Sequence, residues 1–395
     1  MGCEAAGRGS VSTGAVEQPV GESSRWARSS WGLPLALTFG LRVLYSSAAA
    51  IFSTFLPWDP KLVYSNFAEH VMRPDGSARY ALLAVWQRFD TVWYLHIATH
   101  GYDRPDAVVF YPLYPLLLKA LGYVTSPLLA GLAISTAATY FIFWGLKKLL
   151  TLDFHESGAR RVLLLYAAWP GSFIFFAAYP DSLALALMVW SIYLARKERW
   201  KWAGLAGACA ALSKAIGGVV LLPLLVLAYR RRKLHPGTLW LLLIPAASAA
   251  YQGWLRWTGH PLVSSAYSHY WKTPTVWPWI TLWDSVRAIA ITHDPGLILN
   301  LLILAVIAVL ITLPPRRAEY VVYSVALLIL FFAKHSEPLL QSSVRYVLAV
   351  FPAFIGLAAF LQRSRLASRF PLLLTALFIL NLTGLYLFLK WSLVF

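Results

Sequence analysis

The chain of 395 residues is 59% hydrophobic and only 13% charged, and its formal net charge is +17 at pH 7. A water-soluble domain carries about a quarter of its residues as charged side chains, so the composition excludes that class and predicts an all-α, polytopic membrane protein. The basic residues form short clusters between apolar runs, as the positive-inside rule requires. The predicted partner of this charge is therefore the lipid bilayer and not nucleic acid.

The N-terminal region differs from the rest of the chain. Residues 1–30 are rich in Ser, Gly and Ala and contain no apolar core of signal-peptide length. We predict that they form a disordered cytoplasmic tail. Residues 31–395 are predicted to form a single multispan membrane domain, which begins with a retained helix over 31–56.

Two long segments are too polar and too often broken by proline to cross the bilayer, and both are predicted to be external loops. The first covers 57–126 and contains amphipathic pieces at 79–100 and 110–124, which should lie flat at the membrane interface. The second covers 258–295 and is dense in tryptophan. Its indole rings either stack on sugar rings or form an interfacial aromatic belt, and we favour the belt.

The apolar runs predict about eleven crossings in total. Residues 202–229 have basic clusters on both sides, which requires an even number of crossings, yet the segment is too short for two full spans. A hairpin of two short helices, broken at 213–218, resolves this conflict, and such a break requires a cavity enclosed by protein. The other predicted spans are 128–150, 160–178, 183–195, 240–257, 297–313, 320–332, 344–361 and 370–391.

The stretch from Trp86 to Pro115 concentrates polar and aromatic side chains in an otherwise apolar chain. Such a group beside a membrane span is a candidate functional site. Asp90 lies at its centre, and a carboxylate at the interface suits a general base or a group that orients a nucleophilic hydroxyl. The alternative is that Asp90 forms a salt bridge with Arg88 or caps an interfacial helix.

Two histidines follow in the same stretch. His96 and His100 are four residues apart, a spacing that suits chelation of a metal ion on one helix face. No further metal-binding motif accompanies them, and histidines near aromatic residues are more often hydrogen-bonding groups. We therefore predict no metal ligand and no cofactor.

Lys214 and Arg345 are the two cations that stand alone in apolar or neutral surroundings. A charge in such a place is costly and is normally paired. Both side chains suit a lipid phosphate, and the alternative is that they pair with Asp181, Glu337 or Asp90.

Several blocks of the chain resemble the PIG-V family, the group of GPI mannosyltransferase II and its bacterial relatives. The first block resembles, in the same order, three patterns of the family: Arg-Trp-Asp, Ile-Ala-x-His-Gly-Tyr and Phe-Phe-Pro-x-x-Pro. It reads Arg88-Phe89-Asp90, Ile97-Ala98, His100-Gly101-Tyr102 and Phe110-Tyr111-Pro112-Leu113-Tyr114-Pro115.

Three weaker blocks extend the resemblance to about residues 80–355. They are Tyr179-Pro180-Asp181-Ser182, Ser213-Lys214 before Gly217, and Ser343-Val344-Arg345-Tyr346. Lys214 stands where the relatives have Arg, and Asp181 stands where they have Glu. The sign of the charge is kept at both positions, but a lysine does not reproduce the bidentate contact of an arginine.

The resemblance implies a GT-C type glycosyltransferase with an acidic base in the first external loop, the position of Asp90. Such an enzyme moves a sugar, typically mannose, from a polyprenyl-phosphate donor to a lipid or glycan acceptor on the external or luminal face, with inversion. The implied location is the bacterial plasma membrane or the endoplasmic reticulum. Residues implied to bind donor or substrate are Arg88, His100, Tyr102, Asp181, Lys214, Arg345 and Tyr346.

A rival reading is a transporter or flippase of a lipid-linked sugar, with Asp90 and Arg345 as gating charges. Transporters of this size often contain two related halves, and the sequence has no fixed-period repeat. Catalysis predicts that the polar cluster lies in a cavity of an external loop, whereas transport predicts ionisable residues at the bilayer midplane.

Overall fold

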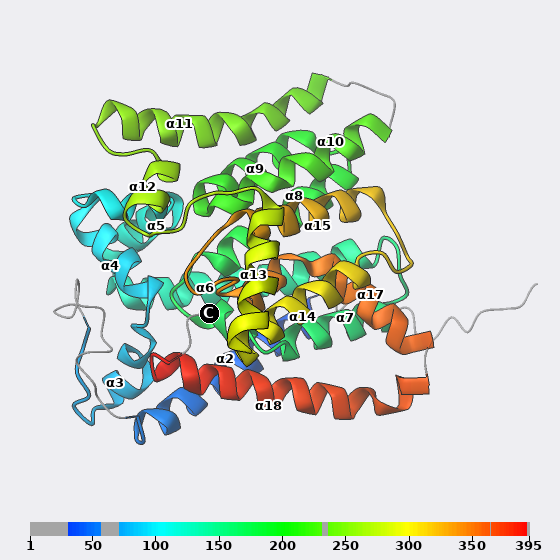
Figure 1. Ribbon diagram of the computed structural model, residues 1–395, viewed down its shortest axis with the longest axis horizontal. Coiled ribbons are helices and arrows are strands. Elements are labelled where there is room, and N and C mark those ends of the chain that lie inside the picture. Colours follow the sequence, from blue (N-terminus) through cyan, green and yellow to red (C-terminus); the bar gives the residue numbers. More distant parts are fainter. Residues whose placement is uncertain (1–30, 57–70, 231–235, 364, 393–395) are drawn as a thin grey trace, which may run out of the picture.

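The computed structural model describes residues 31–56, 71–230, 236–363 and 365–392 (Figure 1). Within these residues the chain is helical and contains no strand, and its one extended pairing is an isolated antiparallel bridge between Thr275 and Lys334. The all-α prediction is confirmed. The predicted tail and residues 57–70 of the first predicted loop lie outside the described residues.

The N-terminal part contains one long helix followed by short ones. Its elements are α2 (Gly32–Ser53), α3 (Ala78–Leu82), the 3-10 turn η2 (Ala84–Trp86), α4 (Asp90–His100), η3 (Pro105–Val109) and α5 (Leu113–Gly122). The amphipathic piece predicted at 79–100 is therefore two helical parts with a break between Trp86 and Asp90. The piece predicted at 110–124 forms α5.

The middle of the chain forms the centre of the bundle. Its elements are α6 (Pro127–Leu150), α7 (Glu156–Ala168), η4 (Ser172–Phe176), α8 (Asp181–Arg196), α9 (Trp200–Ser213), η5 (Ala215–Val220) and α10 (Leu221–Arg230). The predicted break after Ser213 is present. A Cβ atom at Gly217 would lie 2.0 Å from the Ala210 carbonyl oxygen, so η5 folds back closely onto α9 and requires a glycine there.

The C-terminal part departs most from the predicted pattern. Its elements are η6 (Pro236–Leu242), α11 (Leu243–Trp257), α12 (Val263–His269), α13 (Pro278–Thr292), α14 (Pro295–Leu310), α15 (Ala318–Ala333), α16 (Ser343–Tyr346), η7 (Val347–Ala349), α17 (Phe351–Arg363), η8 (Arg365–Arg369) and α18 (Phe370–Leu389). The second predicted loop contains two helices, α12 and α13. The run predicted at 344–361 as one crossing is bent by 86° between its two halves.

Three helical segments of the described chain are long and apolar enough to cross a membrane: α2, α6 and residues 367–389. The bent pair of α16–η7 and α17 gives a fourth if it counts as one span. Several other apolar helices are shorter, such as the 16-residue α14 and α15, which are about 24 Å long at 1.5 Å per residue. These lengths are consistent with a membrane protein.

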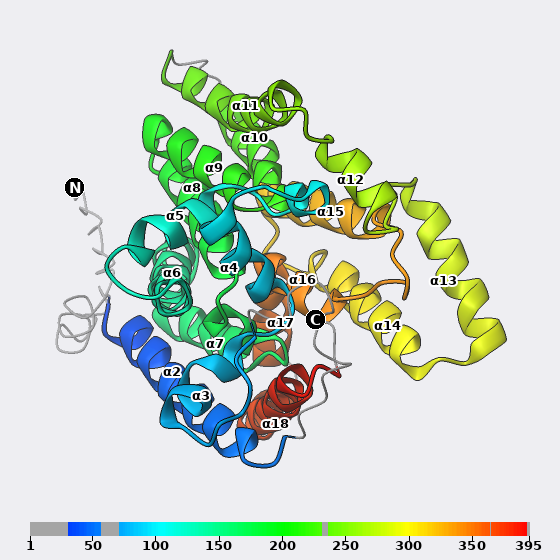
Figure 2. The ribbon, with the colours of Figure 1, turned by 90° about the vertical axis from the view of Figure 1, so that its left-hand side faces the viewer.

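The arrangement brings distant parts of the sequence together. Helices α2 and α18 lie side by side along one side of the bundle, and α11 lies on the opposite side (Figures 1 and 2). Helices α6 to α9 lie between them, and α13 stands at the edge (Figure 2). Helices α4 and α8 begin, and helix α9 ends, close to α16, so the polar residues at these helix ends can meet.

Candidate functional site

Four of the ionisable residues singled out in the sequence meet in one group, here called the Arg345 cluster: Asp90, Asp181, Lys214 and Arg345. Each comes from a different helix end. Asp90 and Asp181 are the first residues of α4 and α8, Lys214 follows the last residue of α9, and Arg345 lies in the short helix α16. The structure therefore brings together charges that are up to 255 residues apart in sequence.

Arg345 is the centre of this cluster. Its Nε and Nη2 donate to the two carboxylate oxygens of Asp181 at 2.8 Å each, and Nη2 also donates to Asp90 Oδ2 at 2.9 Å. The Lys214 Nζ donates to Asp181 Oδ1 at 2.7 Å. A bidentate guanidinium contact fixes both partners in orientation as well as in distance.

The side chains of the cluster differ in how much of their surface is exposed. The side chains of Arg345 and Asp181 are only 7% and 10% exposed, whereas that of Asp90 is 31% exposed. A hollow of about 10 Å³ beside Asp181 and Arg345 has room for about one water molecule. Asp90 is therefore the acidic member that an external hydroxyl group can reach.

Tyr179 holds the backbone at Asp90. Its hydroxyl accepts a hydrogen bond from the Asp90 N–H at 3.1 Å and donates one to the Arg88 carbonyl at 3.2 Å. The Arg345 guanidinium carbon lies 4.7 Å from the centroid of the same ring, within the range of a cation–π contact. One buried side chain thus contacts both ends of the Asp90–Arg345 pair.

Phe89, immediately before Asp90, has a φ of 47°, which a bulky residue adopts only under constraint. The constraint comes from both sides. Tyr179 bonds the flanking peptide groups, and the Phe89 ring packs against Phe388 and Trp391 with centroids 5.5 and 4.9 Å away. This backbone conformation separates α4 from η2 and directs Asp90 toward Arg345.

The segment that carries Arg345 is fixed by hydroxyl and indole groups from neighbouring helices. Trp169 Nε1 donates to the Val344 carbonyl at 2.9 Å, and the Tyr323 hydroxyl donates to the Ala349 carbonyl at 2.8 Å. The Tyr166 hydroxyl bonds the Leu348 carbonyl. Because these groups donate hydrogen bonds to carbonyls that a continuous helix would satisfy internally, the chain can turn between α16 and α17.

Tyr346, another predicted binding residue, borders the cluster. Its ring centroid is 5.6 Å from Lys214 Nζ and 5.3 Å from Lys334 Nζ, and its hydroxyl accepts a hydrogen bond from Lys334 at 3.0 Å. Phe331 stacks on the ring at a centroid distance of 5.1 Å.

Arg88 turns away from Asp90 although the two are close in sequence. Its Nε donates to the Leu389 carbonyl at 2.7 Å, and its guanidinium carbon lies 5.2 Å from the centroid of the Trp391 ring. The proposed Arg88–Asp90 salt bridge is absent from the ion pairs of the described residues, in which Asp90 pairs with Arg345. Arg88 therefore joins the first loop to the end of α18.

His100 and Tyr102 make their contacts at the other end of α4. His100 stacks on His96 at a centroid distance of 4.6 Å, and His96 Nε2 bonds Asp103 at 2.8 Å. The Tyr102 hydroxyl donates to the Phe110 carbonyl at 2.6 Å, and burial raises its pKa. Among the described residues, no three His, Cys, Asp or Glu side chains are grouped to hold a metal ion.

The tryptophans of the second predicted loop divide into two sets. Trp271 is half-buried and donates from Nε1 to the Asp106 carbonyl at 2.9 Å, so it packs the first loop against the second. Trp277 and Trp279 are exposed and stack on one another at 4.9 Å at the start of α13.

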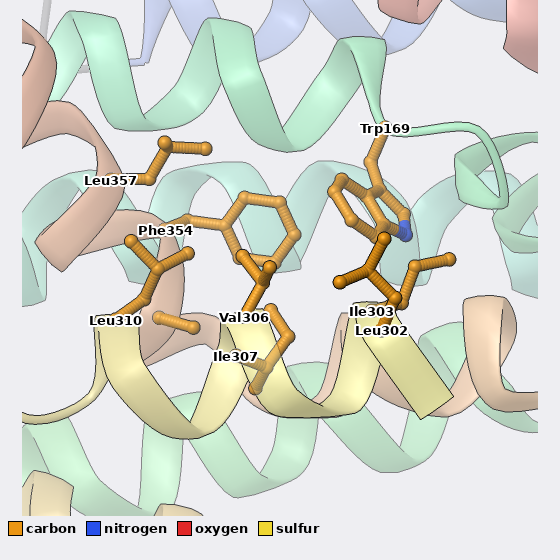
Figure 3. Close-up of a pocket in the computed structure, with 9 residues that line it drawn as sticks. Trp169, Leu302, Ile303, Val306, Ile307, Leu310, Phe354 and Leu357 are labelled. Atoms are coloured by element: carbon orange, nitrogen blue, oxygen red, sulfur yellow. The ribbon is translucent and has the colours of Figure 1, made fainter. Parts of the chain in front are cut away.

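An apolar cavity of about 190 Å³ lies between α14 and α17, and Trp169 closes one end of it (Figure 3). All the side chains that line it are hydrophobic, including Leu302, Val306 and Phe354. Trp169 also donates a hydrogen bond to the carbonyl of Val344, so one side chain contacts both the cavity and the residue before Arg345.

Sequence reasoning missed Tyr179 and Lys334 as members of the site. Tyr179 belongs to a block that resembles the family, but a tyrosine beside a helix start is unremarkable without the contact. Lys334 had a usable signal, since it is a cation that directly follows the apolar helix α15. In comparisons with known proteins, no family model and no curated protein matches the chain.

Proposed function

We propose that this chain is an integral-membrane glycosyltransferase of the GT-C type, similar to the PIG-V mannosyltransferases. It moves a hexose, most simply mannose, from a polyprenyl-phosphate donor to a hydroxyl group of a lipid or glycan. The support is the resemblance of its motifs together with the meeting of four motif residues in one ionic cluster.

The observation that carries the proposal is that the Asp90 carboxylate is both accessible and fixed in orientation. It is the exposed end of a buried chain of charges, Asp90–Arg345–Asp181–Lys214, and strained backbone and Tyr179 fix its direction. A carboxylate needed only to neutralise Arg345 would be as buried as Asp181. An accessible and firmly oriented carboxylate is what general-base catalysis requires.

In the proposed reaction, Asp90 accepts the proton of the acceptor hydroxyl as its oxygen attacks the anomeric carbon. The bond between that carbon and the phosphate oxygen breaks, and the electron pair leaves with the lipid phosphate. Attack opposite to the leaving group inverts the anomeric centre. The phosphate needs no proton in order to leave, so one carboxylate suffices, and cations of the surrounding site stabilise the charge that develops on the phosphate.

The proposal includes a topology of about eleven crossings, with the Arg345 cluster toward the external or luminal face. In this arrangement the helices that are shorter than a full span are continued by broken segments and 3-10 turns. Such irregular backbone is tolerated at membrane depth where it surrounds an internal cavity. The apolar cavity between α14 and α17 supports a lipid-linked donor, because a hydrocarbon chain would bury its apolar surface there (Figure 3).

The test is transfer of radiolabelled mannose from a polyprenyl-phosphate donor by membranes that contain the protein. Asp90→Asn should lower the transfer rate by about 10³-fold or more, because the amide cannot accept the proton. The matched control is Asp75→Asn, which changes an exposed carboxylate of the same loop whose partner is the Ser77 backbone.

Both variants must appear in the membrane in equal amounts. Full transfer by Asp90→Asn would remove Asp90 from the role of base. Movement of an intact lipid-linked sugar across vesicles that contain the wild-type protein, without transfer of the label, would favour the transporter.

A further inference from the structure

Lys334 differs from the other cations at this site in what it contacts. Arg345 is bonded by two carboxylates and Lys214 by one, whereas the side-chain partner of Lys334 is the Tyr346 hydroxyl. Within the part of the chain that the structure describes, Lys334 forms no ion pair. Three cations and two carboxylates therefore leave one positive charge, and it resides at Lys334.

The hydrogen-bonding capacity of this pair is largely unused. A lysine ammonium has three N–H donors, and one of them is bonded to the Tyr346 oxygen. Since that oxygen acts as the acceptor, the Tyr346 hydroxyl keeps its own proton to donate. The unused N–H groups of Lys334 and the O–H group of Tyr346 are on atoms only 3.0 Å apart. One ligand oxygen, or two oxygens of one ligand group, can therefore accept hydrogen bonds from both residues.

Both residues are held in place. The backbone at Lys334 forms the bridge with Thr275, and the next residue, His335, donates its N–H to the Pro274 carbonyl at 3.1 Å. The Tyr346 ring is stacked by Phe331. A preorganised pair of donors pays less conformational entropy when it binds a ligand.

We propose that Lys334 and the Tyr346 hydroxyl bind the phosphate group of an isoprenoid phosphate lipid, and that Arg345 positions Asp90 instead of contacting that phosphate. The inference rests on the proposed function for the identity of the lipid, but the phosphate site follows from the charge and donors described above. An anionic oxygen ligand offers acceptors for every unused donor and neutralises the excess charge. Trp169, which closes one end of the apolar cavity, donates a hydrogen bond to the carbonyl of Val344, two residues before Tyr346.

The test measures binding without turnover. The purified full-length protein is placed in nanodiscs of phosphatidylcholine, and binding of farnesyl phosphate, farnesol and inorganic phosphate is measured for the wild type and for variants. Lys334→Met should weaken farnesyl phosphate binding by about 10- to 100-fold, and Tyr346→Phe by about 3- to 10-fold. Lys334→Arg should keep binding within about 3-fold, because the charge remains.

The control is Lys119→Met, which removes an exposed lysine on α5 of the first loop. It should bind farnesyl phosphate as the wild type does. Farnesol should bind the wild type and Lys334→Met equally, and inorganic phosphate should bind both weakly. For transfer, Lys334→Met should raise KM for the donor and lower kcat/KM, because the cation that binds the phosphate also stabilises the charge that develops on it.

Three outcomes would overturn the proposal: equal farnesyl phosphate binding by the wild type and Lys334→Met, equal losses in Lys334→Met and Lys119→Met, or inorganic phosphate binding as tight as that of farnesyl phosphate. Failure of the proposed function is a separate result. If binding depends on Lys334 while no sugar transfer occurs, the lipid-phosphate site stands and the transferase does not.

Discussion

Two ionic clusters among the described residues are built in opposite ways. The second, here called the Asp153 cluster, joins Asp153, Arg196, Arg317 and Glu319. Asp153 binds both Arg196 and Arg317, and Arg317 Nη1 lies 3.8 Å from Glu319. The carboxylates Asp153 and Glu319 are 5% and 1% exposed, whereas Arg317 is 38% exposed.

Helix α8 connects the two clusters, and α15 connects the Asp153 cluster to Lys334, which borders the Arg345 cluster through Tyr346. Helix α8 begins at Asp181 and ends at Arg196, and α15 follows Arg317 and is followed by Lys334. The 16 residues of each helix separate its ends by about 24 Å. In the Arg345 cluster the guanidinium is buried and a carboxylate is exposed, while in the Asp153 cluster the carboxylates are buried and a guanidinium is exposed.

This difference distinguishes a candidate functional site from an ionic cluster that only stabilises the fold. An exposed carboxylate can accept a proton from a substrate, but a carboxylate covered by guanidinium groups only joins helix ends. Similar residue types at similar helix termini can therefore do different chemistry. What a cluster can do depends on whether its accessible side chain is a carboxylate or a guanidinium group.

The largest expected difference between the two clusters is in how much each contributes to the free energy of unfolding. Asp153→Asn leaves the buried Arg196 without its bidentate partner, so the free energy of unfolding should fall by about 3–5 kcal/mol. Asp90→Asn removes a partly exposed partner of an arginine that keeps Asp181, so it should cost about 1 kcal/mol or less. Thermal unfolding in detergent, followed by tryptophan fluorescence, measures both. Equal losses would show that the two clusters stabilise the fold alike.

A smaller effect is expected for Tyr179→Phe, which removes the partner of the Asp90 N–H and of the Arg88 carbonyl. We expect a loss of about 1–3 kcal/mol in stability and a fall of about 10-fold in kcat with KM little changed, because Asp90 is misdirected. The matched control is Tyr114→Phe, another buried tyrosine, which bonds Ser135. If both variants lose the same activity, Tyr179 acts through stability alone.

The smallest effect is expected for Arg317→Gln. Arg317 is partly exposed, and Asp153 keeps both contacts with Arg196 after its removal. The cost should be about 1 kcal/mol or less, with mannose transfer unchanged. Arg196→Gln is the comparison, since its side chain is more deeply buried. A loss of stability for Arg317→Gln as large as that for Arg196→Gln would contradict the conclusion that Arg317 is the exposed member of the Asp153 cluster.

The helices of the core were predictable because hydropathy is a local property. The runs predicted at 31–56, 128–150 and 370–391 end within a few residues of α2, α6 and α18. The break after Ser213 was also predictable, since basic clusters on both sides of a short apolar segment conflict with a single straight span. Four of the predicted site residues meet because their helix ends meet.

Other features depend on contacts between distant residues. The 86° bend before α17 depends on hydroxyl groups from α7 and α15 that bind carbonyls of η7. Arg88 points away from Asp90 because a carbonyl of α18, 301 residues later, accepts its Nε. Helix α13 was not predicted because the tryptophans and prolines of the surrounding segment, 258–295, suggested a loop. None of these partners is visible from sequence spacing.

The unfavourable torsion at Phe89 gives the C-terminal helix an indirect influence on chemistry. Glycine would adopt this torsion freely, but it would lack the ring that sits among Phe388 and Trp391. The direction of the Asp90 carboxylate thus depends on aromatic packing around the last turn of α18, which has no acidic side chain of its own. If Asp90 is the base of the proposed transfer, substitutions in that turn of α18 should change the rate without touching the acidic residue itself.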